Sequence, residues 1–310
     1  MFNFIQRRNW FYLLSAIVIV PGIVAMIYLT ATIGSPVRLS IDFKGGSLYL
    51  VKFQKPVTET AIRQVYTQFG QEDAVIQQFG SAGDNVWQIR AGSFTPTQQA
   101  QVKAALNERV APIDTNASNF DVVDPEVGSE VTTAAVIAVL AAGIILLGFI
   151  WFAFRNVPHA VRYGTCAIIA MFHDVFVTVG VMALLGIFFK WEADSLFLTA
   201  VLTVVGFSVQ DTIVVFDRIR ENIPKYRGED YETVVNRSLM ETLHRSLSIS
   251  LCSFFVMTAI LLFGGPTIQQ FIAVLLIGLT SGTYSSIFNA VPLLVSWEKG
   301  ELPFTHRAAA

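Results

Sequence analysis

Val204-Val205-Gly206-Phe207-Ser208-Val209-Gln210-Asp211-Thr212-Ile213-Val214-Val215-Phe216 is a mostly apolar stretch with one carboxylate, Asp211, near its middle. On insertion scales, a charged side chain at the centre of a membrane-spanning helix costs about 2.5–3.5 kcal/mol. Asp211 is therefore stable there only if it is protonated, paired with a cation or open to a wet cavity. Each condition makes Asp211 a candidate for binding a proton or an ion. A buried structural ion pair is the alternative.

The composition of the whole chain indicates a polytopic membrane protein in contact with lipid. Of its 310 residues, 53% are hydrophobic and only 14% are charged, whereas soluble domains carry about 25% charged residues. The net charge of −2 gives no basic field for nucleic acid. Cys166 and Cys252 both lie in apolar runs and are expected to be buried small hydrophobes. Since the sequence shows no Cys/His cluster, we expect neither a metal nor another cofactor.

Six apolar stretches are long enough to cross a bilayer as helices. The first is longer than the apolar region of a signal peptide, so we expect it to be retained. A polar segment of about 100 residues separates it from the second stretch and predicts a separate domain. We expect a charged loop between the fourth and fifth helices and a short tail at the end. The predicted parts are the first helix with its tail (1–30), the polar domain (31–130), the bundle of helices two to six (131–297), its loop (217–245) and the tail (298–310).

The distribution of basic residues predicts the orientation of these helices. Lys and Arg concentrate before helix one, between helices two and three, between helices four and five, and after helix six; the segments between helices three and four and between five and six hold one Lys and no Arg. Because basic residues favour the cytoplasmic side, both termini are expected there, with the polar domain outside. These basic residues are Arg7, Arg8, Arg155, Arg162, Arg218, Arg220, Lys225, Arg227, Arg237, Lys299 and Arg307.

The polar domain is predicted to be a β-α-β-β-α-β unit, which is the ferredoxin-like pattern. Thr58 and Thr95 are typical caps of its two helices, and Pro96 and Gln98 complete a capping box at the second. The four predicted strands are 47–53, 74–79, 86–90 and 120–123, with a turn at 80–85. No phosphate loop or catalytic cluster is visible, so a binding or lever role is favoured over catalysis.

Arg245, at the start of the fifth helix, is the predicted partner of Asp211. Helices four and five run in opposite directions, and Asp211 lies about five residues, or about 7 Å, inside the cytoplasmic end of its helix. A nearby guanidinium would hold Asp211 ionised, and moving it away would favour protonation. Helix motion would then change the affinity for a proton. The alternative is that Arg245 only extends to the membrane surface as an orientation signal.

Asp174 is the second acid within an apolar stretch, and His173 precedes it. A relay through His173, Asp174 and Asp211 is one interpretation, and a polar packing role for Asp174 is the other. Small residues also recur at helical spacing, which is typical of close helix packing. They are Gly278, Gly282 and Ser286 in the sixth helix and Ser246, Ser250 and Ser253 in the fifth.

Four motifs in this order resemble the SecF half of the bacterial SecD–SecF protein-export family, within the resistance-nodulation-division superfamily. The most specific is the long helix-four motif that surrounds Asp211, in which Gln210 replaces the Asn of many relatives. The motifs are Asp42-Phe43-Lys44-Gly45-Gly46-Ser47, Val127-Gly128-Ser129-Glu130, His173-Asp174 and residues 204–222. The resemblance implies a bacterial inner-membrane protein with SecD as partner. It also implies contact with the SecYEG translocon, with SecA and YajC as further partners, and with unfolded preprotein.

The resemblance further implies that Asp211 and Arg245 take part in proton transport, with Asp174 a weaker candidate. The expected function is to draw exported proteins outward with the energy of the proton gradient. No covalent chemistry is visible, so we expect no enzyme. Two alternatives are half of a small-solute exporter of the same superfamily, and a passive assembly factor of the translocon.

Overall fold

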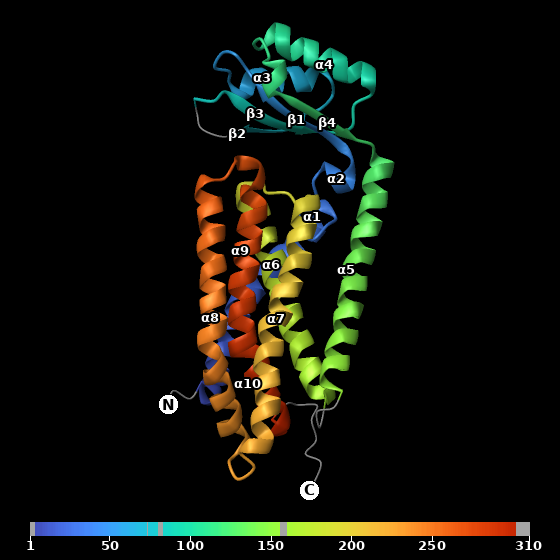
Figure 1. Cartoon of the computed structure of the whole chain (residues 1–310). Helices are drawn as coiled ribbons and strands as arrows, with labels where there is room; N and C mark the ends of the chain where they lie inside the picture. The colour runs from blue at the N-terminus through green and yellow to red at the C-terminus, as the bar shows by residue number, and fades with distance from the viewer. Residues whose placement is uncertain (1–3, 73, 80–82, 156–159, 302–310) are drawn as a thin grey trace. The chain divides into compact units, whose positions relative to one another are not determined.

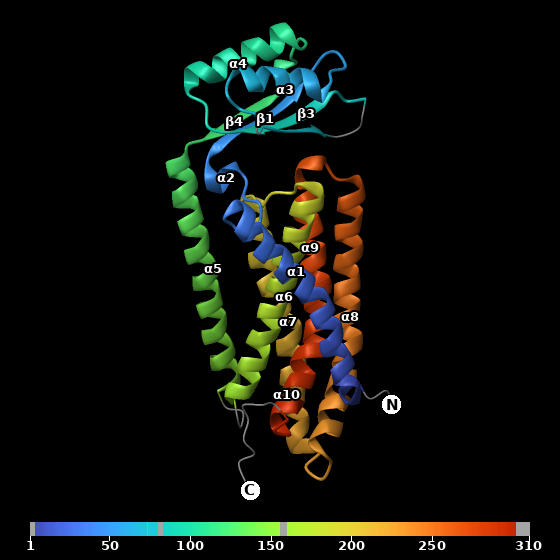
Figure 2. The same cartoon turned by 180° about the vertical axis from the view of Figure 1, so that it is seen from behind.

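The computed structural model describes residues 4–72, 74–79, 83–155 and 160–301. Residues 80–82 of the predicted turn and 302–310 of the predicted tail, including Arg307, lie outside these ranges. The chain divides into a unit of residues 39–137, which contains the sheet, and a helical unit of residues 1–38 and 138–310. Figure 1 and Figure 2 show the elements of both from opposite sides.

The sheet unit has four antiparallel strands in the order β2-β3-β1-β4. Thr58 caps α3, and Thr95 forms the predicted capping box of α4 with Gln98. Both helices cover one face of the sheet (Figure 1), where alternate strand residues such as Tyr49, Val51 and Trp87 are buried. The elements are α2 (Ile41–Lys44), β1 (Gly46–Lys52), α3 (Glu59–Gln68), β2 (Val75–Phe79), β3 (Val86–Ala91), α4 (Pro96–Arg109) and β4 (Asn119–Val123). Their order matches the predicted β-α-β-β-α-β order.

Two glycine segments meet backbone to backbone in the sheet unit. Gly45 and Gly46 have φ angles of 73° and 135°, which favour glycine. A β-carbon on Gly128, near the start of α5 (Pro125–Phe154), would lie 2.7 Å from the Gly45 nitrogen and 3.0 Å from the Phe43 carbonyl oxygen. Thr132, one turn further, donates a hydrogen bond of 3.1 Å to that oxygen. The start of α5 is therefore fixed to the segment that leads into β1.

We expect Gly128→Ala to destabilise this junction by about 1–3 kcal/mol, because the added methyl group overlaps backbone that cannot move aside. Gly143→Ala is the matched control on the same helix, since nothing lies within 4 Å of its β-carbon position. The measurement is hydrogen exchange of residues 41–46 and 128–132 in detergent. Equal protection in the two variants would contradict this account of the junction.

Six helices among the described residues are long and apolar enough to cross a membrane, as the sequence predicts. The sixth span is continuous but contains a π-helical segment, Ser286–Ala290, between α9 and α10. Figure 2 shows α1 crossing the bundle beside α6, against which it packs. The helices are α1 (Arg8–Ile33), α5, α6 (Ala160–Phe189), α7 (Ser195–Lys225), α8 (Tyr231–Phe263), α9 (Pro266–Ser285) and α10 (Val291–Glu298).

Ion pairs join the ends of four helices at one end of the helical unit. The start of α1 is tied to the residues after α10 by Arg8 and Glu301, 2.6 Å apart. The starts of α6 and α8 are tied to the end of α10 through Arg162–Glu298 and Lys299–Glu232. The start of α1, the start of α8 and the end of the sixth span therefore lie together. This is the arrangement that an even number of spans requires.

The prediction of a long charged loop at 217–245 is wrong. Helix α7 continues to Lys225 and α8 begins at Tyr231, so only a short turn separates them. Asp230 caps α8 by accepting a hydrogen bond from the Glu232 nitrogen, and Val235 and Leu239 are fully buried. Although this segment is rich in charged residues, it forms an amphipathic helix whose apolar side packs onto the bundle.

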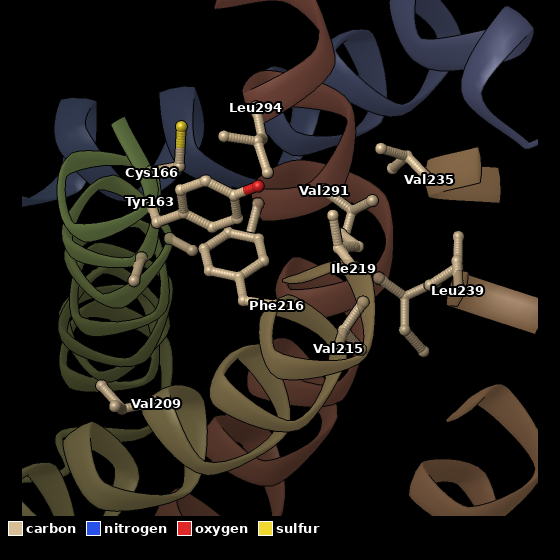
Figure 3. Close-up of a cluster of buried hydrophobic side chains, with 14 of the residues drawn as sticks. Tyr163, Cys166, Val209, Val215, Phe216, Ile219, Val235, Leu239, Val291 and Leu294 are labelled. Carbon is tan, nitrogen blue, oxygen red and sulfur yellow. The ribbon is translucent and has the colours of Figure 1, made fainter. Parts of the chain in front are cut away.

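The core of the helical unit brings α6, α7, α8 and the end of the sixth span together (Figure 3). Tyr163 and Phe216 make an edge-to-face contact with ring centres 5.3 Å apart. Cys166 is fully buried beside them, as predicted. The same prediction is wrong for Cys252, because its side of α8 faces away from the bundle and leaves the thiol exposed.

Candidate functional site

Asp211 is partly exposed on α7 and faces α8. The hydroxyls of Ser246 and Ser250 lie within hydrogen-bonding reach of its carboxyl group. Ser250 also accepts a hydrogen bond of 2.9 Å from the Thr283 hydroxyl of α9. Asp211 therefore belongs to a line of polar groups that connects α7, α8 and α9. The Ser246–Ser250 stripe noted in the sequence is the side of α8 that meets this acid.

Arg245 is exposed and makes no ion pair with Asp211 in the described part of the chain. It lines a polar cavity of about 430 Å³ that also borders Asp217, Glu221 and Glu241. Arg218 in the same cavity bonds to Glu241 at 2.5 Å and to Glu221 at 2.8 Å. Arg245 is nevertheless adjacent in sequence to Ser246, which faces Asp211. In this conformation, serine hydroxyls therefore occupy the place expected for the guanidinium.

Asp174 is fully buried in the middle of α6. Its two oxygens accept hydrogen bonds from different serines of α9, Ser281 on Oδ1 and Ser285 on Oδ2, both at 2.6 Å. The neighbouring His173 places its Nδ1 atom 2.9 Å from Oδ1. Ser281 and Ser285 were not among the predicted site residues. Their spacing of four residues, which puts both on one side of the helix, is the signal that was present.

His173 connects this buried acid to an apolar cavity. Its ring stacks on Tyr284 with centroids 6.3 Å apart. Its Nε2 atom is buried and has no hydrogen-bond partner among the described residues. The ring lines a cavity of about 460 Å³, together with side chains of α1, α8 and α9 such as Leu14, Phe254 and Thr280. His173 thus has one nitrogen on Asp174 and the other directed away from it.

Glycines allow α9 to approach α7 closely near Asp174. A β-carbon on Gly278 would lie 1.9 Å from a methyl group of Val204. A β-carbon on Gly282 would lie 3.4 Å from the Ser208 α-carbon and 3.7 Å from Oδ2 of Asp174. The small-residue stripe of the sixth span is therefore a contact with the side of α7 that carries Val204 and Ser208. No hydrogen bond joins Asp174 to Asp211 directly within the described residues.

Two family models match the chain. The model of the C-terminal part of the protein export membrane proteins SecD and SecF covers residues 101–300, and the SecD/SecF GG motif covers residues 30–57. The chain belongs to the SecD/SecF family of protein-export membrane proteins. The matched GG motif includes Gly45 and Gly46, which form the junction with Gly128.

Relatives that match nearly the whole of this SecD/SecF-family chain carry the name protein translocase subunit SecF. The protein from Thermobaculum terrenum is 43% identical over 310 residues, covering 96% of this chain and 94% of its own. The protein from Anaerolinea thermophila is 43% identical over 304 residues, covering 97% and 96%. These relatives place the chain in the SecF half of the family, as the sequence motifs predict.

The fold is also similar to crystal structures of SecDF, one of them described as a translocon-associated membrane protein from Thermus thermophilus. That structure matches with a TM-score of 0.80 at 28% identity over 96% of this chain. A super-membrane-facing form matches with a TM-score of 0.66 at 29% identity. In both cases this chain spans 39% of the length of the SecDF chain.

The candidate site is built from polar and ionisable side chains. Among the described residues, no group of three or more His, Cys, Asp or Glu side chains is placed so that it could bind a metal ion. The candidate site consists of two carboxyl groups, one imidazole, one guanidinium and several hydroxyls. Such groups can exchange protons and hydrogen bonds within a membrane.

Proposed function

We propose that this SecD/SecF-family chain couples the proton gradient to the outward movement of unfolded proteins through the Sec pathway. The observation that carries the proposal is Asp211, a carboxyl group within a membrane-spanning helix, partly exposed and facing the hydroxyls of Ser246 and Ser250. Intramembrane carboxyl groups in such surroundings are typical of proton relays. No cofactor or covalent chemistry is needed, and the chain is not an enzyme in this proposal.

The proposed orientation places both termini in the cytoplasm and the ferredoxin-like sheet unit outside the bacterial inner membrane. Of the basic residues supporting it, Arg8, Arg162 and Lys299 lie at the end of the helical unit where they pair with Glu301, Glu298 and Glu232. Positive residues near span ends favour the cytoplasmic side. The outer end of the bundle would then be the one where the Arg38 carbonyl accepts a hydrogen bond of 2.6 Å from the Ala193 nitrogen.

In the proposed cycle, Asp211 gains a proton from the outer side and loses it to the cytoplasm. Arg245 approaches Asp211 when the acid is ionised and returns to its polar cavity when the acid is neutral. Helices α7, α8 and α9 repack between the two states, Asp174 holds α6 to α9, and the sheet unit changes orientation to retain the emerging protein. One proton crossing 100 mV supplies about 2.3 kcal/mol. This is comparable to typical coupling energies of about 1–3 kcal/mol.

A SecD-type partner is proposed to supply the part of the complex that this chain does not contain. The chain corresponds to 39% of the SecDF chain that it resembles. Only 6% of the most apolar windows of α5 and α8 is buried within this chain, so lipid or partner helices cover most of these surfaces. Further proposed partners are the SecYEG translocon, SecA, YajC and the unfolded preprotein.

The test is reconstitution of the chain with its SecD-type partner and SecYEG in liposomes. An imposed proton gradient is expected to raise the yield of translocated protein several-fold, and an uncoupler should remove the gain. Lipophilic dyes serve as the comparison substrate. Gradient-driven dye export without protein export would replace this proposal with solute export. Equal translocation with and without the gradient would replace it with passive assembly.

A further inference from the structure

Ser208 is a buried hydroxyl that lacks a role in the proposed cycle. Its side chain is fully buried on α7, and its Oγ atom has no hydrogen-bond partner among the described residues. An unsatisfied buried polar group costs about 1–3 kcal/mol, so such a group calls for an explanation. A hydroxyl can both donate and accept, which makes Ser208 able to receive a hydrogen bond that forms only in another protonation state.

Asp174 and Ser208 both lie against Gly282 of α9. Gly282 lies between them: a β-carbon there would be 3.4 Å from the Ser208 α-carbon and 3.7 Å from Oδ2 of Asp174. The missing side chain leaves room for one methyl group in contact with both residues. Oδ2 is also the oxygen that accepts the Ser285 hydroxyl. Of the two carboxyl oxygens, Oδ2 is therefore the one nearer to Gly282.

We propose that Asp174 is a second proton-binding group of the cycle and that Ser208 accepts the hydrogen bond of its protonated form. The ionised carboxylate accepts from Ser281 and Ser285. A proton that binds to Oδ2 turns this oxygen into a donor, and it donates across the Gly282 space to Ser208 Oγ. The same oxygen becomes a weaker acceptor, so the bond from Ser285 is loosened. This inference rests on the proposed proton coupling and assigns Ser208 and Gly282 to it as positioning residues.

The titratable groups around Asp174 fit this assignment. His173 on its own helix contacts the opposite oxygen, Oδ1, and leaves Oδ2 to Ser285. Tyr284 of α9 stacks on His173. On α7, Asp211 lies three residues beyond Ser208, at the spacing of helical neighbours. The charged residue of α1, Arg8, is paired with Glu301 at the end of the bundle.

The position of Ser285 links proton binding at Asp174 to movement of the helices. Ser285 is the last residue of α9, directly before the π-helical segment Ser286–Ala290. Such segments are frequent at functional sites. Within this one, Asn289 donates a hydrogen bond of 2.9 Å to Ser15 of α1. Weakening the hydrogen bond from Ser285 to Asp174 would therefore release the junction of α9 and α10 from α6. The hydrogen bond from Asn289 would still hold this junction to α1.

The experiment compares Ser208→Ala and Gly282→Ala in the chain reconstituted with its SecD-type partner. The first removes the acceptor, and the second fills the space with a methyl group at ordinary contact distance. Gly206→Ala is the control on α7, because its β-carbon position is open. Proton flux into liposomes and the infrared C=O stretch of protonated Asp174, identified by its loss in Asp174→Asn, are the two readouts.

Both test variants are expected to lower proton flux about three- to tenfold, the range that loss of one hydrogen bond gives. Both should also shift the Asp174 C=O stretch to higher frequency, while Gly206→Ala changes neither. A normal flux and an unshifted band in Ser208→Ala, with flux still abolished by Asp211→Asn, would overturn this inference and leave the proposed function standing. If Asp211→Asn retains flux, the proposed function fails, and the absence of a shift in the Asp174 band would separately exclude the Ser208 bond.

Discussion

Asp211→Asn is expected to reduce gradient-driven export to the level seen when the proton gradient is collapsed, and to abolish proton flux. The amide keeps the size of the side chain and can still hydrogen-bond to Ser246 and Ser250, but it cannot bind or release a proton. Packing and assembly with the partner are therefore expected to persist. Export and flux should be measured in the same liposomes, with assembly checked by co-purification.

Two other variants are controls for the Asp211→Asn result. Asp211→Glu keeps a titratable carboxyl group and should retain part of the activity. Glu229→Gln removes an acid in the turn between α7 and α8 that pairs with Arg237 at 2.9 Å in an exposed position, and exposed pairs contribute little. It should behave like the unmodified protein. Full export and flux in Asp211→Asn would show that the carboxyl group is structural.

Gly278→Ala is expected to have the largest effect on the stability of the helical unit. The added β-carbon would lie 1.9 and 2.8 Å from the two methyl groups of Val204 and 2.9 Å from the Val204 β-carbon. Rotating the Val204 side chain cannot relieve all three contacts, so α9 must move away from α7. Overpacking of this kind typically costs about 1–3 kcal/mol. The measurement is thermal unfolding of the purified protein in detergent.

A second substitution tests the cause of that loss. Val204→Ala removes both methyl groups and should recover part of the stability of Gly278→Ala, although it destabilises the unmodified protein. Gly206→Ala on the same helix has open space around it and should be neutral. Additive losses in the double variant would show that Gly278 and Val204 do not interact as described.

Local patterns predicted the elements of this fold well. Six apolar runs predicted six spans because each helix in a bilayer satisfies its own backbone hydrogen bonds. The strand and helix order of the sheet unit followed from alternation and from caps such as Thr95, whose capping box is present. The prediction at 217–245 is wrong because charged residues are typical both of loops and of the exposed side of an amphipathic helix. The buried Val235 and Leu239 show that the same residues form an amphipathic helix.

Contacts between helices were harder to predict than the helices. The sequence singled out Asp211 and Asp174 because a carboxyl group in an apolar run is unusual. It did not show that serines would face both acids, or that Arg245 would line a separate cavity, because these depend on how each helix is rotated in the bundle. Ser281, Ser285 and Ser208 resemble ordinary small packing residues in the sequence. Only the approach of α9 to α6 and α7 shows their relation to Asp174.

The most direct test of the central claim is infrared difference spectroscopy of the reconstituted complex while the outer side is acidified. Asp211 is predicted to give a carboxylic acid C=O band that appears on acidification, disappears when the gradient is removed, and is missing in Asp211→Asn. The amplitude of the band should follow the rate of export as the gradient is varied. A complex that exports protein in response to the gradient, with no band that depends on Asp211, would contradict the account.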